Sequence, residues 1–187
     1  MGRLSPRLFF GLRMNIVLTG YRCSGKSEVG RLLAEKLGKR FQDIDRLIEE
    51  KNGSIEKMVS EKGWEYFRAI EKKAVAETAK EDDLVIATGG GVVLDEENMK
   101  NLKNHGLIVW LKGDNAVLKE RMIKEERSGK IRPSLTGEKP WEEIERVLHQ
   151  RTPLYRQSCD MELDTSRSTI REVTDMIISS LPEEVKE

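Results

Sequence analysis

Short strand-like segments alternate along the chain with stretches whose apolar residues recur at helical spacing. Short apolar runs rich in β-branched residues are typical of buried strands, whereas apolar positions three and four apart indicate one face of a helix. Strands that alternate with helices favour a parallel sheet covered on both faces, and therefore an α/β fold. The segments predict strands at 16–19, 40–43, 84–87, 107–111 and 161–164.

Helices are predicted between these strands, and two of them have a recognisable beginning. Asp95 can cap a helix that runs to about Lys103, and Thr169-x-x-Glu172 is a capping box that opens the final helix. The segment 128–140 contains two glycines, two prolines and little apolar content, so it predicts a mobile loop. The other predicted helices span 28–37, 45–50, 55–60, 64–80, 115–126 and 141–150.

Length and charge limit the class of protein. With 187 residues the chain is long enough for one α/β domain, which we expect over residues 14–187. Residues 1–13 carry three arginines and no acid, which fits either a transit-like leader or a start codon assigned too early. We favour the second interpretation, with Met14 as the working start. Lys+Arg and Asp+Glu both number 33, and this balance argues against general nucleic-acid binding.

The sequence also argues against a membrane protein and against a disulfide scaffold. No run approaches the roughly 18 consecutive apolar residues of a transmembrane helix. The two cysteines, Cys23 and Cys159, have neither CxxC spacing nor a neighbouring histidine that would suggest a zinc site. Because reduced cysteines are the rule in the cytosol, we expect a cytoplasmic protein with no membrane or nucleic-acid partner.

Residues 20–27 read GYRCSGKS and match the phosphate-binding pattern G-x-x-x-x-G-K-[ST]. The motif lies between a predicted strand and a predicted helix, where backbone N–H groups and the helix dipole both favour an anion. Lys26 would reach the β- and γ-phosphates, and the Ser27 hydroxyl would bind Mg²⁺. The motif predicts a bound nucleoside triphosphate but leaves the reaction open.

Two carboxylates, Asp43 and Asp45, follow the second predicted strand. Ligands of open α/β sheets bind at the carboxyl ends of the strands, so both acids are expected near the site. One could hold the water shell of a metal ion while the other accepts a hydrogen bond from a substrate hydroxyl. The alternative for Asp45 is a cap on the helix that follows.

An arginine and a run of glycines offer groups for a second ligand. Arg68 follows an apolar aromatic residue in the helical segment 63–71, GWEYFRAIE, and a guanidinium held on a helix suits a two-point grip on a carboxylate or phosphate. The alternative is an ordinary surface pair with Glu65 or Glu71. The segment 88–91, TGGG, follows the third strand and would let backbone approach a ligand closely.

Basic residues gather again at 127–133 and in 151–155, RTPLY. A loop that carries arginine can close over a nucleotide, exclude water and neutralise charge on a transferring phosphoryl group. The alternative is a solvated loop with scattered charge.

Taken in order, GxxxxGKS, FxDxD, GWEYFRxxE, TGGG, RP and RxPLY resemble the motifs of shikimate kinases, from about Met14 to the final helix. The resemblance implies a three-layer α/β/α P-loop kinase fold of the nucleoside-monophosphate-kinase type, with a five-stranded parallel sheet. It also implies a helical substrate-binding segment at about 43–80 and a mobile lid at about 127–140. The implied reaction is transfer of the ATP γ-phosphoryl group to the 3-hydroxyl of shikimate, with Mg²⁺, in chorismate and aromatic amino-acid biosynthesis.

The resemblance also assigns roles to individual residues of this chain. It implies that Lys26, Asp45 and Arg132 are catalytic, with Asp45 as the candidate base, and that Ser27 and Asp43 serve the metal ion. The implied substrate-binding residues are Asp45, Arg68, Gly90, Gly91 and Arg151. The implied nucleotide-binding residues are Gly20, Arg22, Cys23, Ser24, Gly25, Lys26, Ser27, Arg127 and Arg132, with an adenine-side loop near 164–166. Cys23 stands where the family often has glycine.

Other P-loop proteins remain as alternatives. A gluconate or nucleotide kinase would share the phosphate loop, but the paired Arg68 and Arg151 favour a small carboxylate as the acceptor. A non-catalytic nucleotide-binding relative would be expected to lack the loop lysine or the aspartate pair, and both are intact here. We expect a monomer whose partners are ATP and shikimate.

Overall fold

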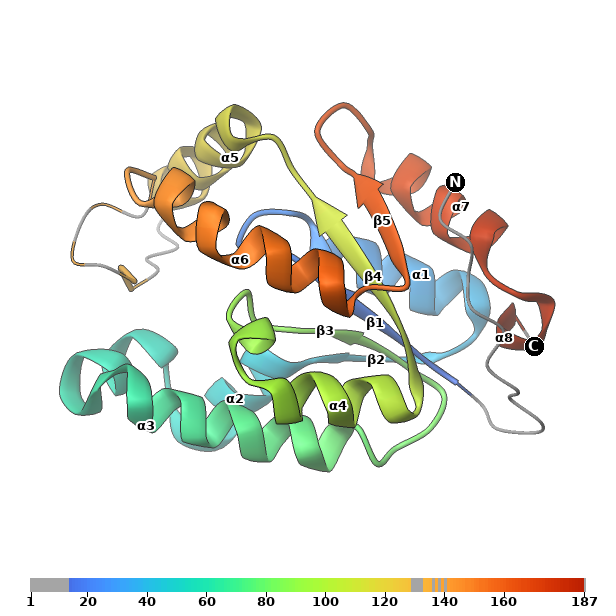
Figure 1. The fold of residues 1–187 in the computed structure, drawn as a ribbon, viewed down its shortest axis with the longest axis horizontal. Helices are drawn as coiled ribbons and strands as arrows, with labels where there is room; N and C mark the ends of the chain where they lie inside the picture. Colours follow the sequence, from blue (N-terminus) through green and yellow to red (C-terminus); the bar gives the residue numbers. More distant parts are fainter. Residues whose placement is uncertain (1–13, 129–132, 136, 138, 140, 187) are drawn as a thin grey trace.

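The computed structural model describes residues 14–128, 133–135, 137, 139 and 141–186, without the side chains of 184 and 186 (Figure 1). The predicted extension 1–13 and the predicted lid arginine, Arg132, lie outside the described residues. The expected lid at 127–140 is described only in part.

Five parallel strands form one sheet in the order β2-β3-β1-β4-β5 (Figure 1). The strands are β1 (Asn15–Thr19), β2 (Arg40–Asp43), β3 (Leu84–Ala87), β4 (Gly106–Lys112) and β5 (Met161–Asp164). β1 is central, and its Leu18 lies opposite Ala87 on one neighbour and Val109 on the other. The α/β class and all five predicted strands are therefore confirmed, with β2, β3 and β5 matching to the residue.

Helices cover both faces of the sheet and make three layers (Figure 1). On one face, α1 and α7 pack Val29, Leu33 and Ile177 against the sheet. On the other face, α3, α4 and α6 contribute Val75, Leu102 and Tyr155 to a second core. The helices are α1 (Lys26–Leu37), α2 (Ile44–Asn52), α3 (Ile55–Thr78), α4 (Glu96–Asn104), α5 (Asn115–Arg127), α6 (Ile144–Ser158), α7 (Ile170–Ser180) and α8 (Glu183–Lys186), with a 3₁₀ turn, η1 (Val92–Leu94), after β3.

The largest correction concerns α6. The sequence predicts a helix over 141–150, whereas α6 begins at Ile144 and continues through Pro153 to Ser158. Proline removes a helical hydrogen bond, but burial of a continuous face outweighs that cost. Val147, Arg151 and Tyr155 are four residues apart and all buried, so the apolar and functional face continues past the proline.

Two predicted helix boundaries are confirmed by their caps. The Asp95 carboxylate accepts hydrogen bonds from the backbone N–H groups of Glu97 and Asn98 at the start of α4. Thr169 and Glu172 form the predicted capping box at the start of α7. The pieces predicted at 55–60 and 64–80 form one element, α3, broken at Gly63, where φ is 81°. In the described part of the chain, no helix combines the length and apolar character needed to cross a bilayer.

Candidate active site

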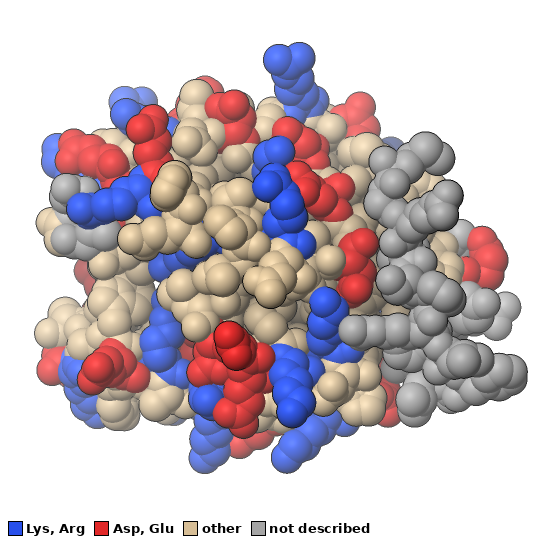
Figure 2. Space-filling view, viewed as in Figure 1, with Lys and Arg blue, Asp and Glu red and all other residues tan. Residues whose placement is uncertain are grey.

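A cavity of about 630 Å³ opens where β1, β2 and β3 end. Figure 2 shows acidic and basic side chains interspersed over one face of the molecule, which is hollowed between α6 and α3. Of the residues predicted for the site, the cavity is lined by Arg22, Cys23, Gly25, Lys26, Ser27, Asp43, Asp45, Arg68, Gly90, Gly91 and Arg151. Gly20 and Ser24 belong to the same loop without lining it, and Arg127 lies exposed at the end of α5.

The phosphate loop wraps around the side chain of Lys26. Its Nζ donates to the carbonyl oxygens of Gly20 at 2.9 Å and Tyr21 at 2.7 Å. Gly25, with φ of 90°, is the residue before α1, and Cys23 also has a positive φ of 60°. The ammonium group is therefore held within the loop, at the helix end whose dipole favours an anion.

The two aspartates occupy different positions at the start of α2. Asp43 Oδ2 accepts the Ser27 hydroxyl at 2.5 Å, and Asp43 Oδ1 accepts the Arg46 N–H, so Asp43 caps α2. The alternative that Asp45 is the cap is wrong, because the backbone reaches its extended, pre-helical conformation at Asp43. Asp45 lies within the first turn of α2 and lines the cavity.

The side chains at the cavity wall suit a magnesium ion that is held mainly by the phosphates of a bound nucleotide. Ser27 and Asp43 bring a hydroxyl and a carboxylate together at the cavity wall. Hard oxygen donors of this kind suit Mg²⁺, which proteins usually hold through one or two side chains together with substrate phosphates. Among the described residues, no group of three or more His, Cys, Asp or Glu side chains could hold a metal ion by itself.

Glu71, which the sequence offered only as a possible surface partner of Arg68, is a buried member of the site. The residue is 1% exposed, and its Oε2 accepts a hydrogen bond from Arg68. A Cβ added to Gly89 would lie 2.7 Å from both Glu71 Oε1 and Asp45 Oδ1, so the glycine makes room for two carboxylates. Burial raises the pKa of Glu71, and the Arg68 charge opposes this effect. The Arg68–Glu71 spacing of three on a helix was the signal for the pair.

Arg68 and Arg151 approach the glycine turn from two different helices. The Arg68 guanidinium lies 5.3 Å from the centre of the Trp64 ring and 2.1 Å from where a Cβ on Gly91 would be. Arg151, from α6, donates to the Gly90 carbonyl oxygen at 2.9 Å. The two positive side chains therefore approach the same glycine turn at the wall of the cavity.

Tyr155 was missed by the sequence analysis although it ends the RTPLY motif. Its hydroxyl also donates to the Gly90 carbonyl oxygen, and its ring stacks on Trp110 of β4. Complete burial raises the pKa of the Tyr155 hydroxyl, which remains a donor. The tyrosine therefore helps fix the glycine turn.

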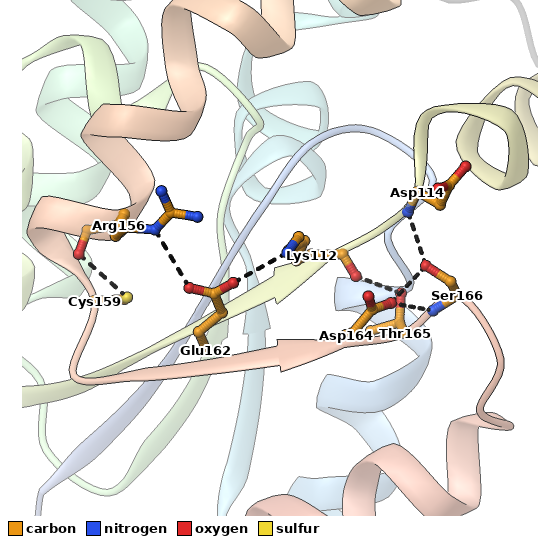
Figure 3. Close-up of polar contacts among 8 residues, drawn as sticks. All are labelled: Lys112, Asp114, Arg156, Cys159, Glu162, Asp164, Thr165 and Ser166. Atoms are coloured by element: carbon orange, nitrogen blue, oxygen red, sulfur yellow. Dashed lines mark hydrogen bonds and ion pairs between the residues drawn. The ribbon is translucent and has the colours of Figure 1, made fainter. Parts of the chain in front are cut away.

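The loop after β5 lies beside the start of α5 (Figure 3). The backbone N–H and the hydroxyl of Ser166 both donate to Asp164 Oδ1, and the Asp114 N–H donates to the Ser166 hydroxyl. These bonds hold the pKa of Asp164 below its ordinary value. A further residue, Arg121, donates to the carbonyl oxygens of Cys23 and Thr165 and so ties this loop to the phosphate loop.

Comparisons with known proteins agree with this geometry. A family model described as "Shikimate kinase" matches residues 22–182. A shikimate kinase of Thermodesulfovibrio yellowstonii is 42% identical over 165 residues, 88% of this chain and 92% of that protein. A shikimate kinase of Syntrophus aciditrophicus is 38% identical over 173 residues, 88% of this chain and 89% of that protein.

Solved structures give the same result. The structure described as a shikimate kinase from Acinetobacter baumannii in complex with shikimate has a TM-score of 0.82 and 33% identity, covering 89% of this chain and 91% of that one. A gluconokinase from Sinorhizobium meliloti has a TM-score of 0.59 at 20% identity, covering 90% and 91% of the two chains. At this identity, the likeness to the gluconokinase shows a shared fold and nothing more.

Proposed function

This chain belongs to the shikimate kinase family, and we propose from that membership and from the site that it phosphorylates shikimate with ATP. The products are shikimate 3-phosphate and ADP. The observation that carries the proposal is the convergence of Arg68 and Arg151 on the glycine turn, in the same cavity as Asp45 and the phosphate loop.

The acceptor half of the cavity suits an anionic polyol. Shikimate is a ring carrying a carboxylate and three hydroxyls. Arg68 and Arg151 supply cations for the carboxylate, and Asp45 supplies an acceptor for hydroxyl groups. Glu71 keeps the Arg68 guanidinium at the glycine turn. A gluconate or nucleotide acceptor has no comparable observation in its favour, because the likeness to the gluconokinase is confined to the fold.

The donor half suits the phosphates of ATP. Lys26 and the backbone of residues 20–27 would hold the β- and γ-phosphates at the start of α1. Ser27 and Asp43 would hold Mg²⁺, which when bound neutralises charge on the phosphate oxygens. Arg127 and the loop 164–166 would lie on the adenine side.

Phosphoryl transfer needs positioning and charge neutralisation more than covalent chemistry by the protein. Asp45 orients the acceptor hydroxyl and takes its proton as the new P–O bond forms. Lys26 neutralises the charge that develops on the transferring group. Arg132 is assigned to the same task from its motif alone, since it lies outside the described residues.

Further assignments complete the proposal. Residues 43–80 form the acceptor-binding segment and residues about 127–140 form the lid. Cys23 and Cys159 are not joined in a disulfide, in keeping with a reducing cytoplasm. Among the described residues only scattered large apolar side chains, such as Tyr66 and Leu94, are exposed, which favours a monomer.

The test is an ADP-release assay with shikimate, gluconate and nucleoside monophosphates offered side by side with MgATP. We expect turnover of shikimate but not of the other acceptors. Without Mg²⁺, no acceptor should be turned over. Robust turnover of another acceptor, with none of shikimate, would reject the proposal.

A further inference from the structure

Glu143, the residue before α6, is fully buried although nothing in its sequence surroundings marks it. Its two carboxylate oxygens contact different parts of the site. Oε1 lies 3.4 Å from Nη1 of Arg22 in the phosphate loop. Oε2 accepts the Ser134 hydroxyl at 3.1 Å and the Leu135 N–H at 2.8 Å. One buried carboxylate therefore links the phosphate loop to the segment 133–135.

The segment 133–135 lies against the acceptor half of the cavity. Pro133 and Leu135 line the cavity wall, and the Ser134 carbonyl oxygen accepts the indole N–H of Trp64 at 3.2 Å. The Trp64 ring in turn lies 5.3 Å from the Arg68 guanidinium. Contacts of Glu143 thus extend from the loop that would hold the donor phosphates to the side chains that would hold the acceptor.

A carboxylate is costly to bury unless donors and positive charge surround it. Among the described residues, the Arg22 guanidinium, the Ser134 hydroxyl and the Leu135 N–H surround Glu143 in this way, and Arg22 is itself only 8% exposed. The energetic consequence is that loss of the Arg22 contact, or of the contacts with Ser134 and Leu135, removes a favourable interaction from a buried carboxylate. Arg22 and the segment 133–135 are therefore held in one arrangement.

We propose that Glu143 is a positioning residue for the reaction, acting on the donor through Oε1 and on the acceptor through Oε2. Through Arg22 it fixes one wall of the phosphate loop. Through Ser134 and Leu135 it fixes the segment that lies over the acceptor. The acceptor half of this inference rests on the proposed function, which identifies the acceptor. The donor half does not depend on which acceptor is used.

The two oxygens can be separated by substitution. In Glu143→Gln, the amide oxygen can still accept from Ser134 and Leu135, whereas the amide NH₂ then faces the Arg22 guanidinium. We expect the affinity for MgADP, measured by calorimetric titration, to fall about tenfold, the effect of losing a hydrogen bond between charged groups. The KM for shikimate should change by less than about twofold, since its supporting hydrogen bonds survive.

Ser134→Ala tests the other oxygen. It removes one neutral hydrogen bond on the acceptor side, so we expect the KM for shikimate to rise about threefold while MgADP affinity is unchanged. Glu142→Gln is the matched control, because Glu142 is the adjacent, exposed carboxylate and the substitution changes charge by the same amount. It should leave both constants at their wild-type values.

A purely structural role gives a different result. It predicts a lower melting temperature for Glu143→Gln with both constants unchanged, or the same loss of donor and acceptor binding in both variants; either outcome overturns the proposal. Failure of Glu143→Gln to fold leaves Ser134→Ala, in which an unchanged KM for shikimate also overturns it. The MgADP titration needs no acceptor, so it judges the donor half even if wild-type enzyme does not use shikimate.

Discussion

Asp45 and Asp43 show how two identical side chains acquire different chemistry from their places in the backbone. Asp43 ends β2 and caps α2 with Oδ1, while its Oδ2 accepts the Ser27 hydroxyl. Asp45 follows two residues later in the first turn of α2 and lines the cavity next to Gly89. The proposed base is therefore the carboxylate that the helix start leaves facing the acceptor.

Asp45→Asn and Lys26→Ala should each lower kcat by about 10²-fold or more while the fold survives. The first removes the acceptor of the hydroxyl proton, and the second removes a charge that neutralises the transferring group. Steady-state kinetics with shikimate and a melting curve measure the two effects. Asp82→Asn, at an exposed position, is the control. A near-normal kcat for Asp45→Asn would show that Asp45 is not the base.

Gly91→Ala should reproduce the defect of Arg68→Ala. A Cβ at Gly91 would lie 2.1 Å from the Arg68 guanidinium, which must then leave the glycine turn. Because the displaced group is the end of a flexible side chain, the fold should persist. Both variants should raise the KM for shikimate by about tenfold or more, as expected for a lost charged contact, with the KM for ATP little changed. Loss of ATP affinity instead would place Arg68 on the donor side.

Cys23 should be alkylated before Cys159, and MgATP should protect it. Cys23 lines the cavity within the phosphate loop, whereas burial and the neighbouring Glu162 and Asp160 carboxylates raise the pKa of the Cys159 thiol and leave it less reactive. The Cys23 thiol donates to Glu125 at 3.3 Å, so slow labelling is expected. Peptide mapping after iodoacetamide treatment identifies the site. Earlier labelling of Cys159, or no protection by MgATP, contradicts this expectation.

At the level of elements, the sequence pattern predicted the features that depend on residues close together in the chain. The three inner strands, β1, β3 and β4, were predictable because each contains a short buried apolar run. The phosphate loop, aspartate pair and glycine turn were predictable because each has its own spacing. The end of α6 was not, because Pro153 is a local signal to stop and only packing of Tyr155 against the sheet overrides it.

Residues missed by the sequence analysis depend on contacts between distant segments. Glu143 stands among other acidic residues, and its buried carboxylate contacts Arg22, 121 positions earlier in the chain. Arg121 likewise meets Thr165 only after the sheet has brought α5 beside the end of β5. Neither contact has a periodicity or motif that a single sequence could display.

The capping box of α7 offers a test confined to one element. Thr169→Ala removes the hydroxyl that accepts the Glu172 N–H and should lower the free energy of unfolding by about 1 kcal/mol. α7 packs on the face of the sheet opposite α3 and α6, so kcat and both KM values should not change. Urea denaturation and steady-state kinetics measure the two quantities. A kinetic defect would mean that the cap at Thr169 is needed to position the adenine-side loop 164–166 for nucleotide binding.

For the whole molecule, the parallel sheet explains why donor and acceptor groups meet. The phosphate loop, the aspartates and the glycine turn follow β1, β2 and β3, which are neighbours in the sheet although they are far apart in the chain. Their carboxyl ends lie at one edge, so three motifs of separate origin line one cavity. The same cavity also contains a buried acid, Glu71.

Glu71 should make the stability of the folded protein depend on pH. Burial raises the pKa of Glu71 above its ordinary value of 4.5, so the native state binds its proton more tightly than the unfolded state. By linkage, its contribution to stability is full below about pH 4.5 and is lost as pH rises through the folded-state pKa. Asp95, Asp164 and Glu172 have lowered pKa values and act in the opposite direction.

A comparison of wild type with Glu71→Gln isolates this effect, because the other three acids are present in both proteins and cancel in the difference. The free energy of unfolding of wild type, relative to the variant, should increase as pH is lowered from 8 towards about 4.5 and then level off. Urea denaturation at a series of pH values measures it. A difference that is flat across this range, or that falls as pH is lowered, would mean that Arg68 outweighs burial and keeps Glu71 ionised in the native state.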